Sequence, residues 1–563
     1  MYFMIKFIVR IGRIKMEKVK VTYLGKSYMY PKDITLEDIS KDFQDNYSET
    51  IIMAEVNGRP YELNYKVTDD VTVDFFDLTS PTGNRVYESG LIFVLEKACL
   101  NMLNSEIEVK YSIDKGIYIK THKKITKEDL DKVSREMKEI VKRNLPIQKN
   151  LVNRLEAIEY YKSTKSYDKV NVLKYSVNTN VNLYRLMDIY NYFFSYLPVS
   201  TGALKEFKLT YIDQNSFVLR YPNIYYLNKI PVYKHHDKLF NEFKKYDEWS
   251  EKLGIENVSS LNNKVTKGNV DDIVLLSENI QNNSLFKIAE TIYNNKKLKL
   301  ILLAGPSSSG KTTTSKKLEL FLKGFGLNPI AISIDNYFVD RDKTPRLPDG
   351  SYDFESLNSI NVELFNKNLK DLLDGKEVTL PVYNFITGKS ELSDESIKLG
   401  EKEILIVEGL HALNEELTYS IDRKNKYKIY LCPLTVLSLD NHNRIRTTDN
   451  RLLRRIVRDN RTRGYSASDT LSTWSKVREG EEKYVFPFQD EADVIFNTSL
   501  IYELGVLKTY AEPLLYSVEE SDPMYKEAVR LLNLLKNILP ISNDYIPVDS
   551  IVREFIGGGY FKL

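Results

Sequence analysis

A phosphate-binding pattern occupies residues 305–312, where the chain reads GPSSSGKT. It matches G-x-x-x-x-G-K-[ST] in full, and an apolar run precedes it while a helical pattern follows, which is the context this loop requires. Several backbone N–H groups of such a loop point at one anion, and a lysine reaches the β- and γ-phosphates. We expect a nucleoside triphosphate to bind here. The expected contacts are Gly305, Pro306, Ser307, Ser308, Ser309, Gly310, Lys311, Thr312 and Thr313, with Lys311 also catalytic and the hydroxyl of Thr312 a ligand of Mg²⁺.

Two acidic residues end later strand-like runs. The run ISID ends at Asp335, and the run EILIVE ends at Glu408. The carboxyl ends of parallel strands form the ligand-binding edge of a doubly wound sheet. Asp335 is therefore placed to accept the proton of an attacking hydroxyl, although an aspartate at a strand end also serves as a helix cap.

Arginines gather further along the chain, with eight of them between residues 444 and 463. Arg451, Arg454, Arg455 and Arg458 are spaced i, i+3, i+4 and i+7, so they share one helix face. Such crowding is unfavourable unless an anion is to bind. We interpret the helix as a lid that neutralises a transferring phosphoryl group and excludes water. A nucleic-acid-binding helix and a solvated face are the alternatives.

The surrounding motifs separate three classes of phosphate-loop protein. No Asn/Thr-Lys-x-Asp guanine-binding motif follows the loop, which disfavours a GTPase. A motor or transporter ATPase would end a strand in Asp, often Asp-Glu, whereas the candidate strand here ends in the lone Glu408. A small-molecule kinase needs an acceptor-side carboxylate, a metal-side carboxylate and an arginine lid. This third set is present, and it predicts an ATP-dependent kinase.

The hydrophobic pattern indicates which elements hold these residues. From residue 297 apolar strand-like runs alternate with helical patterns, as in an α/β domain with a doubly wound parallel sheet covered on both faces. Alternating runs near the start predict a small β-rich domain, and a mixed α+β region follows it. The expected divisions are an extension at 1–15, a β-rich domain at 16–78, an α+β domain at 79–245, a helical linker at 246–290, the α/β domain at 291–520, and a helix with a tail at 521–563.

Composition narrows the setting of the protein. The 80 basic and 78 acidic residues give a net charge of +2, so bulk attraction to nucleic acid is not implied. Two cysteines far apart in the sequence disfavour a disulfide framework and favour the cytoplasm. No apolar run approaches the ~20 residues that span a bilayer, so no membrane partner is expected. The sequence does not give the oligomeric state.

The motifs between about 297 and 505 resemble the uridine kinase/phosphoribulokinase family. SIDNYF resembles the segment that carries the family's catalytic base, and IVEGLHAL resembles its Glu-Gly segment. GSYDFES and LPVYNFITGKS resemble its ribose- and base-binding segments, and RLLRRIVRDNRTRG resembles its lid helix. The resemblance implies ATP and Mg²⁺ as cofactors. It assigns Asp335 as catalytic base, Glu408 to the metal, Arg458 and Arg463 to the phosphates, and Asp353, Tyr383, Phe385 and Arg455 to a nucleoside acceptor.

This chain departs from the family at positions that contact the acceptor. The family's base-contacting His is Gly388 here, the Asp of the same segment is Asn384, and a further lid arginine is Tyr465. Uridine, converted to its 5′-monophosphate, is the default acceptor. A nucleotide-dependent RNA- or ribosome-binding regulator that uses the kinase fold as a switch is one alternative. A kinase of another small hydroxylated metabolite is the other.

The front half resembles a different family. Residues 16–78 resemble a TGS domain, a β-grasp-like module, and residues 79 to about 240 resemble the second, editing-type domain of threonyl-tRNA synthetase, with LPVSTGALKEFKL as the matching segment. The histidines and cysteine of the editing chemistry are absent from the matching positions, which disfavours editing and a metal site. A scaffold, a regulatory ligand site and an RNA contact remain open roles. The four positions are Ser89, Phe93, Phe193 and Leu197.

Overall fold

The computed structural model describes residues 17–562 except 225, 227–228, 348–349, 385–386 and 436. The expected extension at 1–15 and the expected acceptor contact Phe385 therefore lie outside the described residues. The contacts divide the chain into two units. Unit 1 comprises the described residues of Met1–Lys234 with Ser438–Arg444 and Glu519–Lys526, and unit 2 comprises those of His235–Leu437, Ile445–Val518 and Glu527–Leu563.

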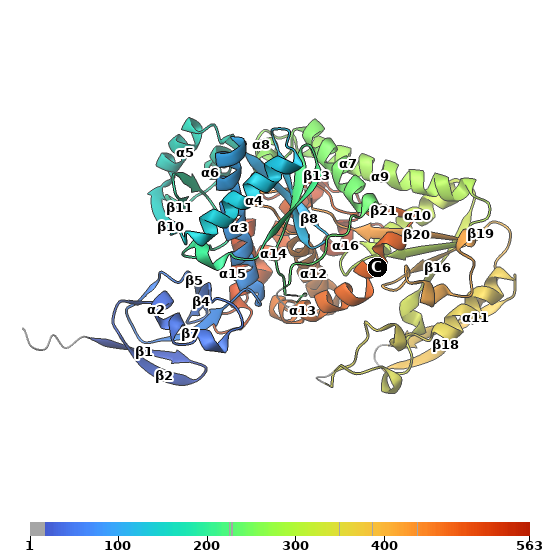
Figure 1. The fold of residues 1–563 in the computed structure, drawn as a ribbon. Coiled ribbons are helices and arrows are strands. Elements are labelled where there is room, and N and C mark those ends of the chain that lie inside the picture. Colours follow the sequence, from blue (N-terminus) through green and yellow to red (C-terminus); the bar gives the residue numbers. More distant parts are fainter. Residues whose placement is uncertain are drawn as a thin grey trace, which may run out of the picture. The chain divides into compact units, whose positions relative to one another are not determined.

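Unit 1 begins with a mixed sheet in the order β2-β1-β7-β4-β5 (Figure 1). Its strands alternate buried and exposed side chains, as in β1, where Val19, Val21 and Tyr23 face the core. The helix α2 starts where Thr35 accepts a hydrogen bond from the Asp38 N–H group, a typical N-cap. The elements are β1 Lys18–Tyr23, β2 Lys26–Pro31, β3 Ile34–Thr35, α2 Leu36–Lys41, β4 Met53–Val56, β5 Arg59–Tyr61, β6 Lys66–Val67 and β7 Val71–Phe76.

The rest of unit 1 is an α+β assembly. A sheet in the order β13-β14-β9-β8 and a sheet in the order β10-β11-β12 accompany α3 and α4. Thr126 is the N-cap of α4 and forms a full capping box with Asp129. The elements are α3 Pro81–Leu103, β8 Ile107–Ile113, β9 Gly116–Thr121, α4 Lys127–Lys142, β10 Gln148–Asn153, α5 Arg154–Ser163, α6 Tyr167–Lys174, β11 Asn180–Leu186, β12 Ile189–Asn191, β13 Lys208–Asp213 and β14 Ser216–Arg220.

The four positions that match editing residues lie in the interior of unit 1. The rings of Phe93 and Phe193 are 5.2 Å apart in an edge-to-face contact. Leu197 is buried in the same hydrophobic core, and Ser89 is buried on α3. Three of the four side chains are thus apolar core residues, and the fourth, Ser89, is a buried hydroxyl.

The hairpin Ser438–Arg444, which precedes the arginine-rich helix in sequence, is anchored within unit 1. The Asp440 carboxylate accepts hydrogen bonds from Lys169 Nζ at 2.6 Å and from the backbone N–H of His442 and Asn443. Both side chains of the Lys169–Asp440 pair are almost fully buried.

Further contacts hold the same hairpin. The Val109 N–H on β8 donates to Asn441 O at 2.7 Å, which adds the hairpin to the edge of that sheet. Arg444 donates two hydrogen bonds to the Glu88 carboxylate on α3, at 3.1 and 3.2 Å. The segment Glu519–Lys526 is held in unit 1 as well, because Lys526 Nζ lies 2.9 Å from Glu55 Oε2.

Unit 2 contains the expected parallel sheet, in the order β16-β19-β15-β20-β21 (Figure 1). Every neighbouring pair in this sheet is parallel. Its central strand β15 is buried along its whole length, as the apolar run predicts. A separate hairpin pairs β17 with β18. The strands are β15 Leu300–Ala304, β16 Asn328–Ser333, β17 Val378–Asn384, β18 Lys389–Ile397, β19 Glu403–Glu408, β20 Lys426–Cys432 and β21 Val494–Asn497.

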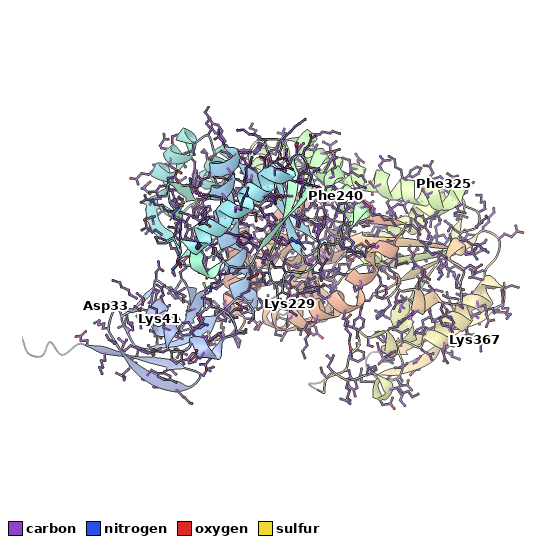
Figure 2. The ribbon with its side chains drawn as sticks, viewed as in Figure 1. Asp33, Lys41, Lys229, Phe240, Phe325 and Lys367 are labelled. Carbon is purple, nitrogen blue, oxygen red and sulfur yellow. The ribbon has the colours of Figure 1, made fainter. Side chains whose placement is uncertain are left out.

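Helices of unit 2 pack on this sheet and on each other. The residues expected to form a helical linker belong to α7–α9, of which α7 contacts β21 and α9 contacts α10. Phe325, labelled in Figure 2, follows α10 and stacks on Tyr293 of α9 with ring centroids 5.1 Å apart. The helices are α7 Asp237–Leu253, α8 Val258–Thr266, α9 Val270–Asn294, α10 Lys311–Gly324, α11 Val362–Leu373, α12 Thr447–Arg463, α13 Ala467–Tyr484, α14 Glu503–Tyr516, α15 Tyr525–Leu535 and α16 Arg553–Ile556.

Within the described ranges, every helix is too short or too polar to span a bilayer.

The buried Lys169–Asp440 pair leads to a first prediction. Asp440→Ala leaves an uncompensated ammonium group in the interior of unit 1, so we expect the free energy of unfolding to fall by about 3–5 kcal/mol. Glu159→Ala breaks the exposed Lys162–Glu159 pair and should cost no more than about 1 kcal/mol. Urea unfolding, combined with hydrogen exchange at the Val109 amide, measures both variants. Equal losses would contradict the anchoring role of Asp440.

Candidate active site

The phosphate-binding loop joins β15 to α10 in unit 2, at the carboxyl edge of the parallel sheet. Gly310 has φ +82°, a conformation that L side chains rarely adopt. A Cβ atom on Gly305 would lie 2.6 Å from Leu431 O, so only glycine fits between the loop and β20. The two glycines of the motif are therefore required by the path of the backbone.

Lys311 opens α10 with its ammonium group turned back onto the loop. Its Nζ donates to Gly305 O at 2.9 Å and to Pro306 O at 3.2 Å. Burial lowers the pKa of Lys311, while the carboxylates of Glu408 and Glu554 oppose that shift. The predicted phosphate-binding cation is thus held inside the loop and within electrostatic reach of the sheet-edge acids.

Asp335 and Glu408 lie at the same edge of the sheet. Glu408 ends β19 and is in register with Ser333, the last residue of β16, and Asp335 follows two residues later in a 3-10 turn. Part of the Asp335 residue is exposed to solvent, but its carboxyl group is crowded by surrounding protein. This desolvation raises the pKa of the carboxyl group, while the positive charges of Lys311 and Arg463 act to lower it. The predicted base therefore lies within electrostatic reach of the predicted phosphate-binding lysine.

Glu408 has the properties of a metal-side carboxylate. Burial raises the pKa of Glu408 to about 7, and its Oε2 atom is buried without a hydrogen-bond partner among the residues that the structure describes. A hard cation such as Mg²⁺ satisfies such an oxygen and favours its ionised form. Thr312, in the first turn of α10, is partly exposed and would supply the second protein oxygen. The residues present fit Mg²⁺, which commonly takes one or two protein oxygens and completes its shell with phosphates and water.

The arginine-rich helix α12 contains two buried structural arginines. Arg451 pairs with Glu481, and Arg454 pairs with Glu503, with all four side chains nearly inaccessible to solvent. Their guanidinium groups also donate to the loop, from Arg451 Nε to Ser307 O at 3.0 Å and from Arg454 to Ser308 O. The interpretation of all four spaced arginines as an anion-binding face is therefore wrong for these two, because buried glutamates already neutralise them.

Three of the other four arginines of α12 surround one buried aspartate. Arg455, Arg458 and Arg463 lie 3.1, 2.8 and 3.4 Å from the carboxylate of Asp459. Arg455 also donates to Ser307 Oγ at 2.7 Å. These three are the arginines that the resemblance assigns to acceptor and phosphates, so the structure brings them together at the loop.

Two of the expected acceptor residues, Asp353 and Tyr383, are linked through a chain of aromatic contacts in unit 2. The Asp353 carboxylate accepts a hydrogen bond from Tyr484 OH at 3.2 Å. The ring of Tyr383 is 5.4 Å from that of Phe338, which lies 5.9 Å from Phe354, the residue next to Asp353. An acidic hydrogen-bond acceptor thus adjoins an aromatic surface.

Some residues of this site carry no signal in the motifs. Tyr484 ends α13, far along the chain from Asp353. His411 Nε2 donates to Glu355 O at 2.9 Å, and burial lowers the pKa of His411 to about 4, so the ring is neutral at physiological pH. Asp459 and Glu481 are single acids among many, and only the fold reveals their arginine partners.

The departure at Gly388 has a structural reason. Gly388 has φ +71°, and a Cβ atom there would lie 2.8 Å from both Cβ and Nε of Arg341. The Gly388 carbonyl also accepts a hydrogen bond from the Arg341 N–H at 2.8 Å. A histidine does not fit at this position while Arg341 holds its place. Tyr465, the other substituted position, is half exposed just after α12.

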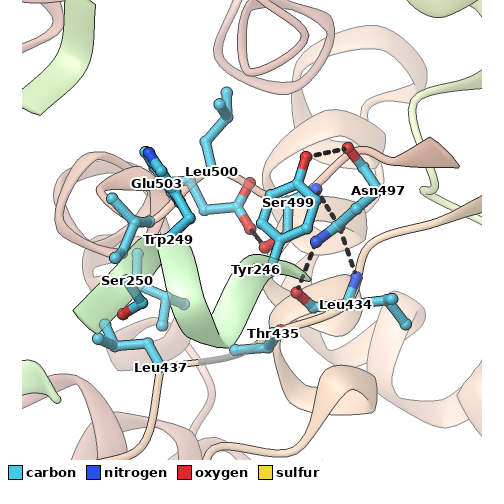
Figure 3. A pocket seen from close by; sticks show the side chains of 12 residues that line it. Tyr246, Trp249, Ser250, Leu434, Thr435, Leu437, Asn497, Ser499, Leu500 and Glu503 are labelled. Carbon is cyan, nitrogen blue, oxygen red and sulfur yellow. Dashed lines mark hydrogen bonds between the residues drawn. The ribbon is translucent and has the colours of Figure 1, made fainter. Parts of the chain in front are cut away.

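A small pocket between α7 and the sheet is separate from these residues (Figure 3). Asn497 crosses it, accepting from the Leu434 N–H at 2.9 Å and donating to Leu434 O at 3.2 Å. Tyr246 OH donates to the Asn497 carbonyl at 3.4 Å. The volume of about 20 Å³ suits a single water molecule rather than a nucleotide.

The loop, the sheet edge and the arginine helix define a phosphate-loop kinase fold, and comparisons with known proteins agree. Residues 300–501 match the model of the Phosphoribulokinase / Uridine kinase family. The uridine kinase of Borrelia duttonii (strain Ly) is 30% identical over 224 residues, which cover 38% of this chain and 95% of that enzyme. The chain belongs to this family through unit 2.

Other similarities are partial. The threonine–tRNA ligase of Fusobacterium nucleatum is 29% identical over 232 residues, and the matched part covers 39% of this chain but only 37% of the ligase. This similarity confirms the resemblance of the front half to threonyl-tRNA synthetase. A solved structure described as a possible uridine kinase from Bacillus stearothermophilus is 20% identical, with a TM-score of 0.22, over 36% of this chain and 89% of its own. A score this low carries no argument.

The two kinds of arginine on α12 predict different responses to substitution. Arg454→Met leaves the Glu503 carboxylate buried and unpaired, so we expect the free energy of unfolding to fall by about 3–5 kcal/mol. Arg463→Met removes a side chain that is 50% exposed, and the loss should stay below about 1 kcal/mol. Denaturant unfolding of both variants measures the difference. An Arg463 loss as large as that of Arg454 would show that the division is wrong.

Proposed function

We propose that the protein transfers the γ-phosphoryl group of ATP to the hydroxyl of a nucleoside, most simply the 5′-hydroxyl of uridine. The observation that carries the proposal is the clustering of Lys311, Asp335 and Glu408 within electrostatic reach of one another at the sheet edge. Phosphoryl transfer depends on positioning and charge neutralisation, and this edge supplies both.

The loop residues would bind the triphosphate through the N–H groups that open α10. Lys311 would exchange its hydrogen bonds with the loop carbonyls for the β- and γ-phosphate oxygens. Thr312 and Glu408 would hold Mg²⁺, which supplies neutralisation of the phosphate charge when it is bound.

Asp335 would accept the proton of the attacking hydroxyl as the new P–O bond forms. Its raised pKa brings the carboxylate closer to the range in which a base works well near neutral pH. Arg455, Arg458 and Arg463 would stabilise the charge of the transferring group, and Asp459 would keep their guanidinium groups together until the phosphates arrive.

A nucleoside acceptor is supported by the neighbourhood of Asp353. A carboxylate can accept hydrogen bonds from two ribose hydroxyls, and the exposed ring of Phe354, which packs on the buried rings of Phe338 and Tyr383, would offer a face to a planar base. The family relatives named as uridine kinases favour uridine. The contact that Gly388 lacks would have to come from another donor.

Substitution of the two central residues tests the chemistry. Lys311→Ala should abolish turnover because the phosphates lose their cation. Asp335→Asn should lower kcat by roughly 100-fold or more while leaving ATP affinity largely unchanged, since a general base contributes about 10²–10⁴-fold. Steady-state kinetics and ATP binding provide the two readouts. The exposed Asp342→Asn is the matched control, and near-normal turnover of Asp335→Asn would overturn the base assignment.

The acceptor is tested by a product screen. Purified protein with ATP and Mg²⁺ is incubated with nucleosides and sugars, and phosphorylated products are identified by mass spectrometry. We expect uridine 5′-monophosphate and ADP in equal amounts. ADP formation stimulated by RNA without any phosphorylated small molecule would instead support the nucleotide-dependent RNA-binding regulator. A phosphorylated sugar without any nucleoside monophosphate would show that the acceptor is a sugar, and would still support kinase activity.

A further inference from the structure

The C-terminal segment of unit 2, here residues 549–559, places a carboxylate on the phosphate-binding loop. The Thr313 N–H, in the first turn of α10, donates a hydrogen bond to Glu554 Oε2 at 3.1 Å. The first N–H groups of a helix have no partner within the helix and attract anions. Glu554, on the short helix α16, is only 8% exposed and therefore occupies this anion position in the folded chain.

A second carboxylate, that of Glu481, also contacts the loop, but it differs from Glu554 in its ion pairs. The Ser307 N–H donates to Glu481 Oε1 at 2.8 Å. Glu481 is held there by ion pairs with Arg451 and Arg478, so it is a fixed part of the loop's support. Glu554 forms no ion pair within 4.0 Å in the described part of the chain, and its negative charge acts on Lys311.

The segment around Glu554 contacts both the loop and the arginine-rich helix α12. A Cβ atom on Gly310 would lie 2.6 Å from Ile551 Cγ2, so this side chain is in contact with the loop glycine. Arg461 donates to Glu554 O at 2.9 Å and to Phe555 O at 3.1 Å. The segment then ends in three consecutive glycines, residues 557–559, of which the first two have positive φ.

We propose that Glu554 is an autoinhibitory stand-in for a nucleotide phosphate, and that the C-terminal segment must withdraw from the loop before ATP can bind. A phosphate and a carboxylate cannot share one N–H donor, and their like charges repel each other at this distance. Because Glu554 lacks the ion pairs that fix Glu481, it is the carboxylate that nucleotide displaces. The proposal rests on the nucleotide site of the proposed function.

Binding measurements on the full chain test the contact. Glu554→Gln keeps the shape and an oxygen acceptor but removes the charge that competes with phosphate. We expect this variant to bind ATP and ADP at least about 10-fold more tightly than the wild type in calorimetric titrations. Asp549→Asn is the matched control, since Asp549 lies on the same segment but pairs with Lys317 at 3.1 Å, and its affinity should be unchanged. Unchanged or weaker binding by Glu554→Gln would overturn the proposal.

Hydrogen exchange of the wild-type protein gives a second, independent readout. Saturating ATP should increase amide exchange in residues 551–557, because the segment leaves the loop. Increased protection there would overturn the proposal, since it would make the segment part of the bound nucleotide site. Binding of nucleotide by neither protein would overturn the nucleotide site itself, whereas equal binding by both would overturn only the inhibitory role of Glu554.

Discussion

The concentration of positive charge beside one loop is the constraint on which unit 2 depends. Arginine side chains from α12 and the Lys311 ammonium approach the same turn of backbone, and like charges at such distances repel strongly when water is scarce. Buried carboxylates make the arrangement stable. Glu481 and Glu503 each neutralise one interior arginine, and Asp459 offsets part of the charge of Arg455, Arg458 and Arg463. The positive side chains and the carboxylates that offset them are close together around this loop, and the net charge of +2 for the whole chain does not reveal this arrangement.

Local periodicity made much of this fold predictable. The parallel strands of unit 2 are short apolar runs between helices, and the loop sequence carries its own backbone requirements in Gly305 and Gly310. The positions of Lys311, Asp335 and Glu408 follow from the ends of those strands. The α4 cap at Thr126 is likewise a signal contained within four residues. Each of these features depends on residues that are close together in the sequence.

The features that could not be predicted depend on distant partners. Arg454 is separated from Glu503 by 49 residues, and Thr313 is separated from Glu554 by 241. Spacing alone placed Arg451 and Arg454 with the anion-binding arginines, because the helix pattern does not reveal which guanidinium groups meet a buried acid. Nothing in the sequence near the hairpin at 438–444 indicates that Lys169 and Glu88 receive it.

The hairpin Ser438–Arg444 has a consequence for the history of this chain. A joined pair of ancestral modules can ordinarily be parted again by cutting the linker between them. Here the carboxyl half contributes a hairpin whose buried Asp440 has its counter-ion, Lys169, in the amino half. Deletion of the amino half would remove the counter-ions of Asp440 and Arg444, which are Lys169 and Glu88. The two halves are therefore difficult to separate by deletion.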